Sequence, residues 1–535
     1  MADNLRRETM RSVDTAWLRM DDPTNLMIIN GVMMFRGTLD LERVRRMVEI
    51  RMLRFHRFRQ RVVEQPLGVG APYWEDDPNF HINSHVKRLA LPDPGDDQTL
   101  QELVGDMMAV PMDLTKPPWQ IYVIENYHGH DQHGHPIANG TVVFTRLHHC
   151  IADGMALVQV FLSLTDEQAD APEGGKEPSR RSRRDDAQSD LPPLLRLLQS
   201  RARTAVGLGR SLLNQGSRSL SNPFYGLGLT RLAVELATDS AAELANLALM
   251  PPDPQTVLKG KLGVAKSVAW SEPIALADVK AIGKATGATV NDVLMTAATA
   301  ALRSYIQGRG ESADGVEVRA AIPVNLRPPG KTGDLGNNFA LVFLSLPVGI
   351  GTTQARLKEV KKRMDALKGS AQAMVAYGIL QALGRMPGPV ESQAVQFFAS
   401  KATTVLTNVP GPQQPLYFTG NPIEKILFWV PQSGRLGMGI SIFSYNGTVT
   451  LGVATDTGLV PDPEQIVAGF HTAFGELLAL VEEELPAQTP SLPPAGRSAV
   501  EDVGGFCAAH TKTGNPCRNR PMAESAYCRV HQAAG

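Results

Sequence analysis

Two adjacent histidines, His148 and His149, are the residues around which this sequence is organised. The apolar run 141–145 precedes them and another, 155–164, follows, so we expect them where a buried strand ends and a helix begins. A neutral imidazole, whose ordinary pKa is about 6.5, can take a proton from a hydroxyl and deliver it to a leaving group. Adjacent side chains diverge, so one histidine should face a substrate while the other packs. Asp153 could fix the loop by pairing with an arginine elsewhere in the chain.

The stretch 148–154 reads His-His-Cys-Ile-Ala-Asp-Gly. It resembles the motif of the HHxxxDG acyltransferases, and within them the bacterial wax ester synthase/diacylglycerol acyltransferases (WS/DGAT). Every fixed position of the motif is present, Gly154 included. A motif this short also fits a pair of core histidines with satisfied hydrogen bonds, or part of a metal site. Cys150 suggests a Cys–His nucleophile, but neighbouring side chains diverge, so we expect this thiol to pack.

Further segments resemble WS/DGAT motifs in the same order along the chain, and they extend the resemblance over residues 12–484. These segments are 12–35, 111–119, 287–294, 319–327, 336–339, 404–412 and 437–447. One of them departs from the family pattern P-L-D-x-x-x-P-L-W, because Met112 and Pro118 replace its two leucines. The resemblance implies an α/β fold of two chloramphenicol-acetyltransferase-like domains, with a central substrate tunnel between them and His149 near its middle.

Four residues outside the histidine motif have expected roles. Trp119 should anchor its proline-rich loop to the core by burying a large apolar area. Asp292 suits the first turn of a helix that begins near residue 290, because a carboxylate there complements the helix dipole. The resemblance alone assigns substrate positioning to Asn291 and Asp292. It also makes Arg327 the expected ion-pair partner of the motif aspartate.

The composition is that of an ordinary globular protein, since 43% of the 535 residues are hydrophobic and 20% are charged. A net charge of −1 creates no attraction to polyanions, so we expect no nucleic-acid partner. No apolar run approaches the ~18 residues of a spanning helix, and the N-terminus lacks the apolar core of a signal peptide. Only four cysteines are present, which excludes a disulfide framework and favours a reducing, cytoplasmic setting.

Composition shifts and the resemblance divide the chain into six predicted segments. They are an N-terminal acyltransferase domain (1–164), a disordered linker (165–190), a basic helical arm (191–260), a C-terminal acyltransferase domain (261–484), a proline-rich linker (485–503) and a C-terminal zinc-binding module (504–535). The Pro-, Gly- and Ser-rich first linker cannot bury a core, which is why we expect it to be disordered.

Two segments allow more than one interpretation. The loop 127–135 carries four histidines, which could bind a metal, but its Gly and Asp residues favour a solvated hairpin loop. The stretch 191–231 contains six arginines and no acidic residue, with apolar residues at helical spacing. Such a basic amphipathic helix could lie on an anionic membrane or lipid-droplet surface, or it could pack on the protein with its arginines in water.

The last segment has the residues of a tetrahedral zinc site. Cys507, Cys517, Cys528 and His531 follow the spacing C-x9-C-x10-C-x2-H, and three thiolates with one imidazole form a sufficient ligand set. A segment this short has no core of its own, so a metal would have to hold it together. We expect one structural zinc rather than unliganded cysteines. The segment resembles small Cys/His modules appended to bacterial proteins, and its protein partner is unknown.

These features together predict an acyl-CoA-dependent O-acyltransferase that esterifies diacylglycerol or a long-chain alcohol. His149 would be the general base, with acyl-CoA as a substrate and no cofactor needed for catalysis. We expect a peripheral location at the inner membrane face or on lipid droplets. Two alternatives stay open. One is condensation-type or carrier-protein-dependent acyl transfer on the same fold, and the other is a non-catalytic lipid-droplet protein.

Overall fold

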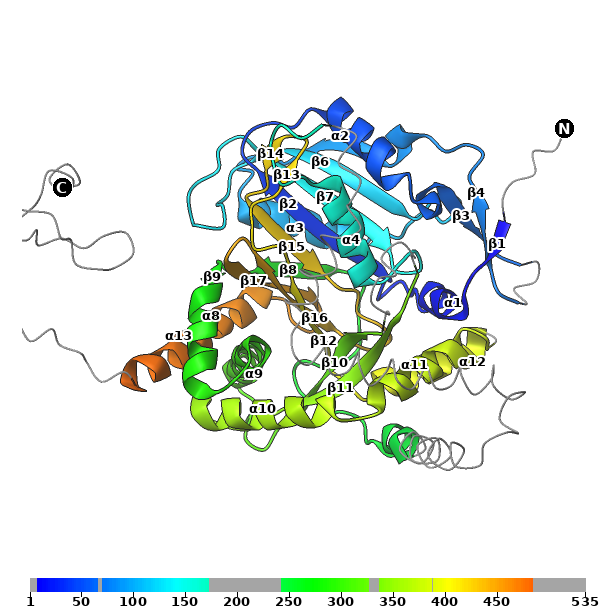
Figure 1. Cartoon of the computed structure of the whole chain (residues 1–535). Helices are drawn as coiled ribbons and strands as arrows, with labels where there is room; N and C mark the ends of the chain where they lie inside the picture. Colours follow the sequence, from blue (N-terminus) through cyan, green and yellow to red (C-terminus); the bar gives the residue numbers. More distant parts are fainter. Residues whose placement is uncertain (1–6, 66–69, 173–241, 327–335, 387, 485–535) are drawn as a thin grey trace, which may run out of the picture. The chain divides into compact units, whose positions relative to one another are not determined.

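Two β-sheets with helices packed on their faces carry the architecture of this computed structural model (Figure 1). The structure describes residues 7–65, 70–172, 242–326, 336–386 and 388–484. These residues belong to one unit that ends at Glu484. The predicted second linker and zinc-binding module, at 485–535, lie outside the described residues.

The first sheet holds the strand that leads to the histidines, and its strand order is β15-β2-β7-β6-β5. Strand β7 (Gly140–His148) is central and runs antiparallel to β2 (Ile28–Phe35) and β6 (Trp119–Tyr127) on either side. All nine residues of β7 are buried. Burial on both faces explains why residues 141–145 are all β-branched or aromatic and do not alternate with charged residues.

The second sheet has the order β11-β10-β12-β16-β17-β8, and a short strand β9 also pairs with β17. Its strands are β8 (Lys266–Trp270), β9 (Ile274–Ala275), β10 (Val318–Asn325), β11 (Phe339–Leu346), β12 (Thr404–Pro410), β16 (Met438–Tyr445) and β17 (Thr448–Asp456). Asn446 and Gly447 join β16 to β17 with φ angles of 46° and 79°. Both angles suit the left-handed turn that a two-residue hairpin requires, and the Asn-Gly sequence is typical of such a turn.

One strand connects the two halves of the chain. Strand β15 (Lys425–Trp429) comes from the predicted C-terminal domain, yet it pairs with β2 in the first sheet, with Lys425 opposite Met34. It also contacts β16 and β17 of the second sheet. The division into contiguous domains at 1–164 and 261–484 stays a prediction. Strand β15 does not follow it, because its residues fall in the predicted C-terminal domain while the strand pairs in the first sheet.

Smaller strands complete the described sheets. They are β1 (Arg7–Thr9), β4 (Tyr73–Asp76) and β3 (Gln60–Val63) in that order, the pair β13 (Tyr417–Phe418) and β14 (Asn421–Pro422), and the edge strand β5 (Val86–Ala90) of the first sheet.

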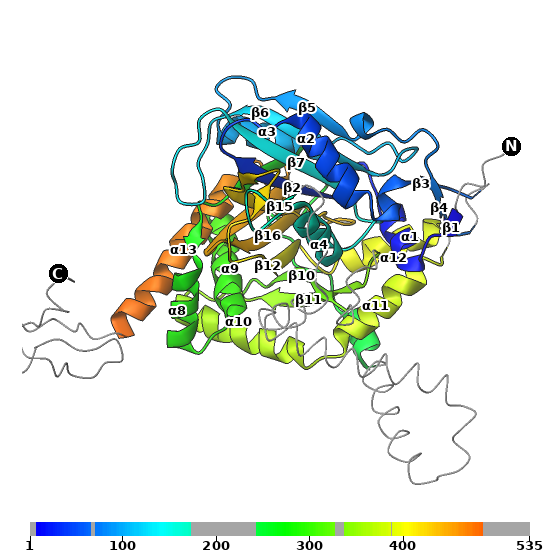
Figure 2. The same ribbon diagram turned by 45° about the horizontal axis from the view of Figure 1, so that its top comes forward.

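The helices of the N-terminal half cover both faces of the first sheet. Helix α2 (Leu41–Met47) and the π-helical turn that follows it pack on one face, and α3 (Asp97–Met108) packs on the other, where it also meets β8. Helix α4 (Gly154–Leu164) follows the histidines, and both ribbon views place it at the junction of the two sheets (Figure 2). Helix α1 (Ser12–Arg19) contacts α11 and α12 of the other half.

The helices of the C-terminal half pack around α9, which is buried along most of its length by α8, α10 and α13. They are α8 (Leu276–Thr286), α9 (Val290–Gly308), α10 (Thr353–Lys368), α11 (Gln372–Leu383), α12 (Gly388–Ala399) and α13 (Pro463–Glu484). Across the described ranges, no helix combines the length and the apolarity needed to cross a bilayer.

The described ends of the predicted linker and arm pack on this fold. Asp166 forms a β-bridge with Tyr417, and its carboxylate accepts a hydrogen bond from Arg51 at 2.9 Å. Residues 242–249 are helical, and Lys401 Nζ donates to the carbonyl of Ala248 at 3.2 Å. Placed backbone therefore continues beyond the predicted start of the linker at 165, while 173–241 lies outside the described residues.

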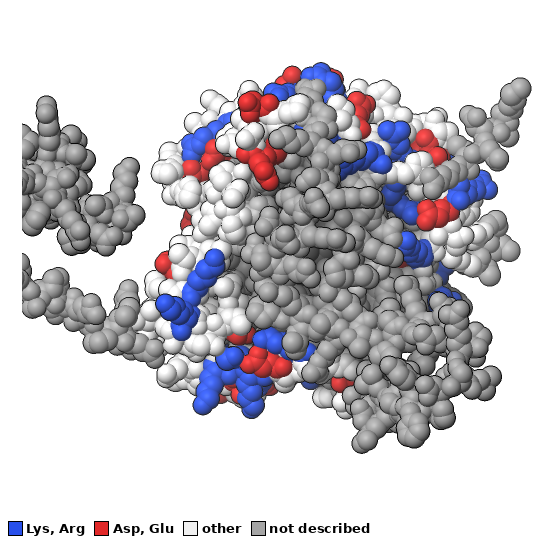
Figure 3. Space-filling view, viewed as in Figure 1, with Lys and Arg blue, Asp and Glu red and all other residues white. Residues whose placement is uncertain are grey.

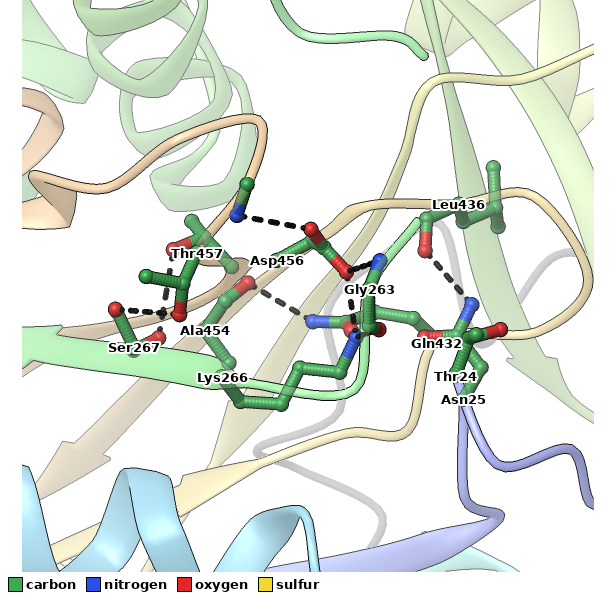
Figure 4. Close-up of polar contacts among 12 residues, drawn as sticks. Thr24, Asn25, Gly263, Lys266, Ser267, Gln432, Leu436, Ala454, Asp456 and Thr457 are labelled. Carbon is green, nitrogen blue, oxygen red and sulfur yellow. Dashed lines mark hydrogen bonds and ion pairs between the residues drawn. The ribbon is translucent and has the colours of Figure 1, made fainter. Parts of the chain in front are cut away.

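A buried polar cluster fixes the end of β17 (Figure 4). Asp456 is fully buried, and its Oδ2 accepts a hydrogen bond from Lys266 Nζ at 3.0 Å. Gln432 and Asn25 each donate a side-chain N–H to a main-chain carbonyl of the cluster, at 2.9 Å and 3.0 Å. Burial lowers the pKa of Lys266, and the nearby carboxylate opposes this effect. The cluster thereby ties the N-terminal loop to β8 and β17, and we assign it a structural role.

Charges of both signs are interspersed on the described surface in Figure 3. On α10, for example, Lys361 pairs with Asp365 at 3.0 Å and Arg363 pairs with Glu359 at 2.9 Å. This mixed pattern agrees with the small net charge of the chain and gives the described part of this face no strong field of one sign.

Gly384 lies where the end of α11 closely approaches the start of α1. A substitution at this position therefore tests the packing of the C-terminal half against the N-terminal half. A Cβ at Gly384, which follows the last residue of α11, would lie 1.6 Å from the main-chain oxygen of Ser12, whereas a Cβ at Gly378 within α11 would meet nothing within 4 Å. Gly384→Ala should lower the free energy of unfolding by about 1–3 kcal/mol through overpacking. Gly378→Ala should leave it unchanged or raise it by up to about 1 kcal/mol. Urea unfolding of both variants checks this, and equal midpoints would contradict the docking.

Candidate active site

The chain places His149 in the turn between β7 and α4, as the sequence predicted. The main-chain N–H of His149 donates to the carbonyl of Met27 at 2.7 Å, which ties the turn to the start of β2. The carbonyl of Asp153 accepts from the N–H of Leu157 at 2.9 Å and opens α4. The imidazole is therefore held on both sides by regular structure, which fixes its position.

An asparagine from the second sheet holds the His149 ring. Nδ1 of His149 lies 2.9 Å from Oδ1 of Asn337. The Asn337 amide nitrogen donates to Oδ1 of Asp14 and to the main-chain oxygen of His149, each at 2.8 Å. Because both donors of the amide group are used in this way, its oxygen is the acceptor, and His149 Nδ1 must carry the proton. Nε2 is then the unprotonated nitrogen that can act as a base.

Aromatic rings enclose His149 on the other sides. The indole of Trp17 stacks on the imidazole with ring centroids 4.4 Å apart and an interplanar angle of 20°. Phe339 lies with its ring centroid 5.2 Å from the imidazole. Both residues are buried, with 4% and 6% of their surface exposed. This apolar enclosure keeps water from the ring and disfavours its charged form.

Burial lowers the pKa of His149 to about 4, although the hydrogen bond to Asn337 opposes this effect. The imidazole is therefore neutral at physiological pH, which is the state that a general base requires. Burial has the opposite effect on the carboxylate behind it, because it raises the pKa of Asp14 to about 6 against the lowering effect of the Asn337 hydrogen bonds.

His148 packs instead of facing a substrate, as expected for one member of the pair. Its side chain is fully buried, the N–H of Cys150 donates to Nδ1 at 3.2 Å, and Nε2 lies 3.7 Å from Oδ1 of Asp21. Burial favours the neutral form of His148, whereas the neighbouring Cys150 and Asp21 raise its pKa. Because the Cys150 N–H occupies the Nδ1 side, the proton that this ring holds lies on Nε2, toward Asp21. The Cys150 thiol is buried as well.

Asp153 is held by the residue next to Asn337. Its Oδ2 accepts the main-chain N–H of Asn338 at 2.9 Å, and its side chain is buried. Arg327, its expected partner, lies outside the described residues, so the ion pair stays a prediction. Two consecutive asparagines of one segment thus reach both functional residues of the histidine motif.

A cavity of about 180 Å³ adjoins the histidine. His149, Asp153 and Asn408 supply polar groups, and the rest of the wall is mostly apolar. Apolar wall residues come from both sheets and from α4, for example Ile29, Leu157, Leu341, Val405 and Phe428. A second apolar cavity of about 90 Å³ lies toward α11 and α12, and the two cavities share Trp17 and Leu341 as wall residues.

Asn291 and Asp292 occupy the N-terminus of α9. Asp292 and Thr289 form a capping box, with the Asp292 N–H to Thr289 Oγ1 at 3.2 Å and the Thr289 N–H to Asp292 Oδ2 at 2.8 Å. Oδ1 of Asn291 accepts from Nδ2 of Asn408, a cavity residue, at 2.6 Å. The contact links Asn291 to the cavity through one neighbour, and the expected substrate role of both residues stays a prediction.

Trp119 anchors its loop, in agreement with the expectation from the sequence. Its side chain is 1% exposed, its Nε1 donates to the carbonyl of Phe58 at 2.8 Å, and its ring stacks on His85. The hydrogen bond satisfies the indole N–H, so the large ring is buried without leaving a polar group unpaired.

The histidine-rich stretch 127–135 belongs to the connection between β6 and β7, and Asp131 organises it. Its Oδ1 accepts the main-chain N–H groups of His133 and His135 at 2.7 Å and 2.9 Å. Within the described ranges, no group of three His, Cys, Asp or Glu side chains could hold a metal ion. The predicted ligands Cys507, Cys517, Cys528 and His531 lie outside the described residues, so the zinc site stays a prediction.

No role was predicted from the sequence for three residues that contact or support His149. Asn337 and Asp14 each lie in a segment that resembles a family motif, and Trp17 lies in the same helix as Asp14. In the sequence, the signal that could have pointed to these residues was their position in the family-like motifs at 12–35 and 336–339. The structure adds that these two motifs contact each other. Gly336, with a φ of 113°, has a conformation that suits glycine and turns the chain toward α1.

Comparison with known proteins identifies similar chains. The model of the wax ester synthase/diacylglycerol acyltransferase catalytic domain matches residues 10–294, and the model of the WS/DGAT C-terminal domain matches residues 335–478. A probable diacylglycerol O-acyltransferase, tgs1, of Mycobacterium tuberculosis H37Rv is 28% identical over 429 residues, which cover 79% of this chain and 85% of that protein. A putative diacylglycerol O-acyltransferase of the same strain is 26% identical over 445 residues, with 80% of each chain covered.

Solved structures share the fold. The wax ester synthase/diacylglycerol acyltransferase from Marinobacter aquaeolei VT8 aligns with a TM-score of 0.60 at 20% identity, over 89% of this chain and 99% of that one. The first condensation domain of the calcium-dependent antibiotic synthetase gives 0.55 at 14%, over 89% and 96%. The trichothecene 15-O-acetyltransferase TRI3 of Fusarium sporotrichioides gives 0.55 at 15%, over 88% and 95%. The expected mixed α/β acyltransferase fold is therefore confirmed.

The hydrogen-bond pattern predicts which nitrogen of His149 carries the proton. In protein labelled with ¹⁵N-histidine, the His149 ring should give the signals of a neutral Nδ1–H tautomer. Because its pKa lies near 4, the ring should stay neutral as the pH falls from 8 to 5. His149→Gln identifies the signal by its loss. An Nε2–H tautomer at pH 8, or a titration midpoint of the ring near 6.5, would contradict the assignment.

Proposed function

The chain belongs to the wax ester synthase/diacylglycerol acyltransferase family, and on that premise we propose the substrates and the residues of its acyl transfer. The protein is an acyltransferase of the diacylglycerol O-acyltransferase and wax ester synthase type. The acyl donor is acyl-CoA, and the acceptor is a diacylglycerol or a long-chain alcohol. The observation that carries this proposal is a neutral imidazole with an unprotonated Nε2 beside an apolar cavity.

His149 is the general base in the proposed reaction. Nε2 takes the proton from the acceptor hydroxyl while the oxygen attacks the thioester carbonyl of acyl-CoA. The tetrahedral intermediate then collapses, the carbon–sulfur bond breaks, and the CoA thiolate takes the proton from the imidazolium. Nδ1 keeps its proton throughout, because Asn337 holds it. The acyl group passes directly from sulfur to oxygen, and the Cys150 thiol takes no part.

The cavities suit apolar acceptors and apolar acyl chains. Burial of each methylene group from water contributes about 0.8 kcal/mol, so a long chain binds chiefly by its length. The two adjoining cavities share Trp17 and Leu341, which places apolar space on both sides of the ring that covers His149. Polar side chains are a minority of the residues that line the larger cavity.

Other residues support the base in this proposal. Asp153 pairs with Arg327 and shapes the loop around the histidines, together with its hydrogen bond from Asn338. Gly154 allows α4 to begin directly after that carboxylate. Asn291 and Asp292 position the acceptor through the contact of Asn291 with Asn408 at the cavity wall.

The attachments beyond the catalytic unit are part of the same proposal. Supply of apolar substrates requires contact with the lipids that contain them, and the basic arm at 191–260 provides a peripheral attachment to the inner membrane face or to lipid droplets. Cys507, Cys517, Cys528 and His531 hold one structural zinc, which takes no part in acyl transfer. Both statements rest on the sequence, since these residues lie outside the described ranges apart from 242–260.

Substitution of His149 tests the proposed base. Purified protein is supplied with palmitoyl-CoA and either diolein or hexadecanol, and release of CoA is followed together with the lipid product. His149→Ala should lower turnover by about 10²- to 10⁴-fold, which is the usual contribution of a general base. His56→Ala changes a half-exposed histidine that pairs with Asp76, and it should keep wild-type turnover. Turnover of His149→Ala close to that of the wild type would rule out the mechanism.

Absence of turnover by the wild-type protein with both acceptors would favour the alternatives. Aminoacyl or carrier-protein substrates that gave product would indicate condensation-type transfer. Lipid binding without any product would indicate a non-catalytic lipid-droplet protein. These outcomes are distinguishable in one set of assays, because each has its own product or lack of one.

The zinc proposal has its own measurement. Full-length protein should contain one zinc per chain by elemental analysis. Cys507→Ser combined with Cys517→Ser should remove that zinc, because two ligands are too few to hold it. Turnover should stay within about twofold of wild type, since the base is an imidazole and needs no metal. Zinc retained in the double variant would place the metal elsewhere.

A further inference from the structure

A buried carboxylate lies directly behind the asparagine that holds the base. Asp14 is 3% exposed and belongs to the first turn of α1. Its Oδ1 accepts two hydrogen bonds from Asn337, one from the main-chain N–H at 2.9 Å and one from Nδ2 at 2.8 Å. Asn337 is 323 positions away in sequence, and its amide oxygen faces His149. The three side chains form a continuous chain from α1 to the base.

We propose that Asp14 and Asn337 are positioning residues that hold His149 in the base-competent tautomer, and that acyl transfer therefore requires the ionised form of Asp14. This inference rests on the proposed function, in which Nε2 of His149 is the base. Neither residue needs to touch a substrate, because each acts on the reaction through His149.

The side-chain amide of Asn337 has one end that accepts hydrogen bonds and one end that donates them. If the Asn337 amide were turned over, its NH₂ group would face Nδ1, and Nδ1 could only accept. The proton of the imidazole would then lie on Nε2, and the lone pair needed for catalysis would be lost. An ionised carboxylate accepts hydrogen bonds only, so it selects the orientation in which Nδ2 faces Asp14. A protonated Asp14 is also a donor and excludes the wrong orientation less strongly, because the main-chain oxygen of His149 is then the one partner of the NH₂ group that can only accept.

The surroundings of Asp14 determine when it ionises. Arg11 and Arg57 are the cationic neighbours that favour the carboxylate, and Arg57 is itself paired with Glu8 at 3.1 Å. Asp14 also lies in the first turn of a helix, where the helix dipole favours a negative charge. Burial outweighs these effects and raises its pKa to about 6.

The groups around His149 differ from those around Asp14. They are the buried His148, which lowers the pKa of His149, the amide of Asn337, and Asp153 of the same motif. Because burial lowers the pKa of His149 to about 4, protonation of the base alone would reduce turnover only near pH 4. Protonation of Asp14 occurs at higher pH, so the loss of activity on the acid side should follow Asp14.

The test is the pH dependence of kcat in full-length protein, with palmitoyl-CoA and hexadecanol between pH 5 and 8.5. Wild-type kcat should fall as the pH decreases through about 6. Asp14→Asn should lower kcat at pH 7.5 by about 10- to 1000-fold, as expected for a base held partly in the wrong tautomer. The decline near pH 6 should disappear in this variant, because an amide does not titrate there. A profile that keeps the wild-type midpoint would overturn the inference.

A matched control separates this effect from general loss of structure. Asp253 is another buried aspartate whose pKa is raised by burial, and it is hydrogen-bonded to Thr403 and to the N–H of Arg319. Asp253→Asn should keep the acid limb of the wild type. Thermal unfolding at each pH should show that all proteins compared are folded during the assay.

A double-mutant cycle tests whether Asp14 acts through Asn337. Asn337→Ala removes the connection between Asp14 and His149, so it should lower kcat and also abolish the decline near pH 6. The double variant with Asp14→Asn should then be no slower than Asn337→Ala alone, because the two residues act as one unit. Independent, multiplicative losses in the double variant would show that no such unit exists.

Direct observation of the ring distinguishes failure of the inference from failure of the proposed function. The ¹⁵N signals of His149 should report the Nδ1–H tautomer in wild-type protein and a mixture of tautomers in Asp14→Asn. This readout needs no turnover, so it applies even if the substrates named above are wrong. An unchanged pure Nδ1–H tautomer in Asp14→Asn would overturn the inference by itself.

Discussion

The hydrogen bond between His149 and Asn337 is the interaction on which the rest of the site depends. It joins residues 188 positions apart and crosses from the first sheet to the segment that opens β11 of the second. The proposed base therefore follows a strand of one sheet, and the group that orients it precedes a strand of the other. Relative movement of the two sheets would separate His149 Nδ1 from the Asn337 oxygen. The proposed reaction therefore requires the two sheets to keep a fixed relative position.

Several contacts of the described chain hold the two sheets in that relative position. Strand β15 pairs with β2 of the first sheet and also contacts β16 and β17 of the second, so one strand belongs to the packing of both sheets. Helix α3 packs on the first sheet and against β8. Helix α1 brings Asp14 and Trp17 to the site and meets α11 at the position of Gly384 (Figure 2). Elements far from the histidine thus determine its surroundings.

Sequence periodicity was sufficient for local structure and insufficient for the contacts between segments. The strand before the histidines and the helix that begins near residue 290 follow from residue patterns a few positions long, and both are present. The pairing of β15 with β2 carries no local signal, because its β-branched and aromatic residues suit either sheet. Asn337 and Asp14 were recognisable as parts of motifs, but their contact joins positions 323 apart. Only the tertiary structure shows that they share a hydrogen bond.

A neutral amide between the base and the carboxylate has a physical consequence for an apolar site. A carboxylate in direct contact with the imidazole would raise its pKa by roughly 1–3 units, and the base would then be protonated more often at neutral pH. Asn337 orients the ring while adding no charge next to the cavity. In the proposed acyl transfer His149 becomes positively charged, and the aligned amide dipole and the more distant Asp14 would stabilise that charge. Asn337 thus orients the imidazole, while the negative charge of Asp14 stays one residue further away. This allows a deeply buried histidine to remain neutral beside an apolar cavity.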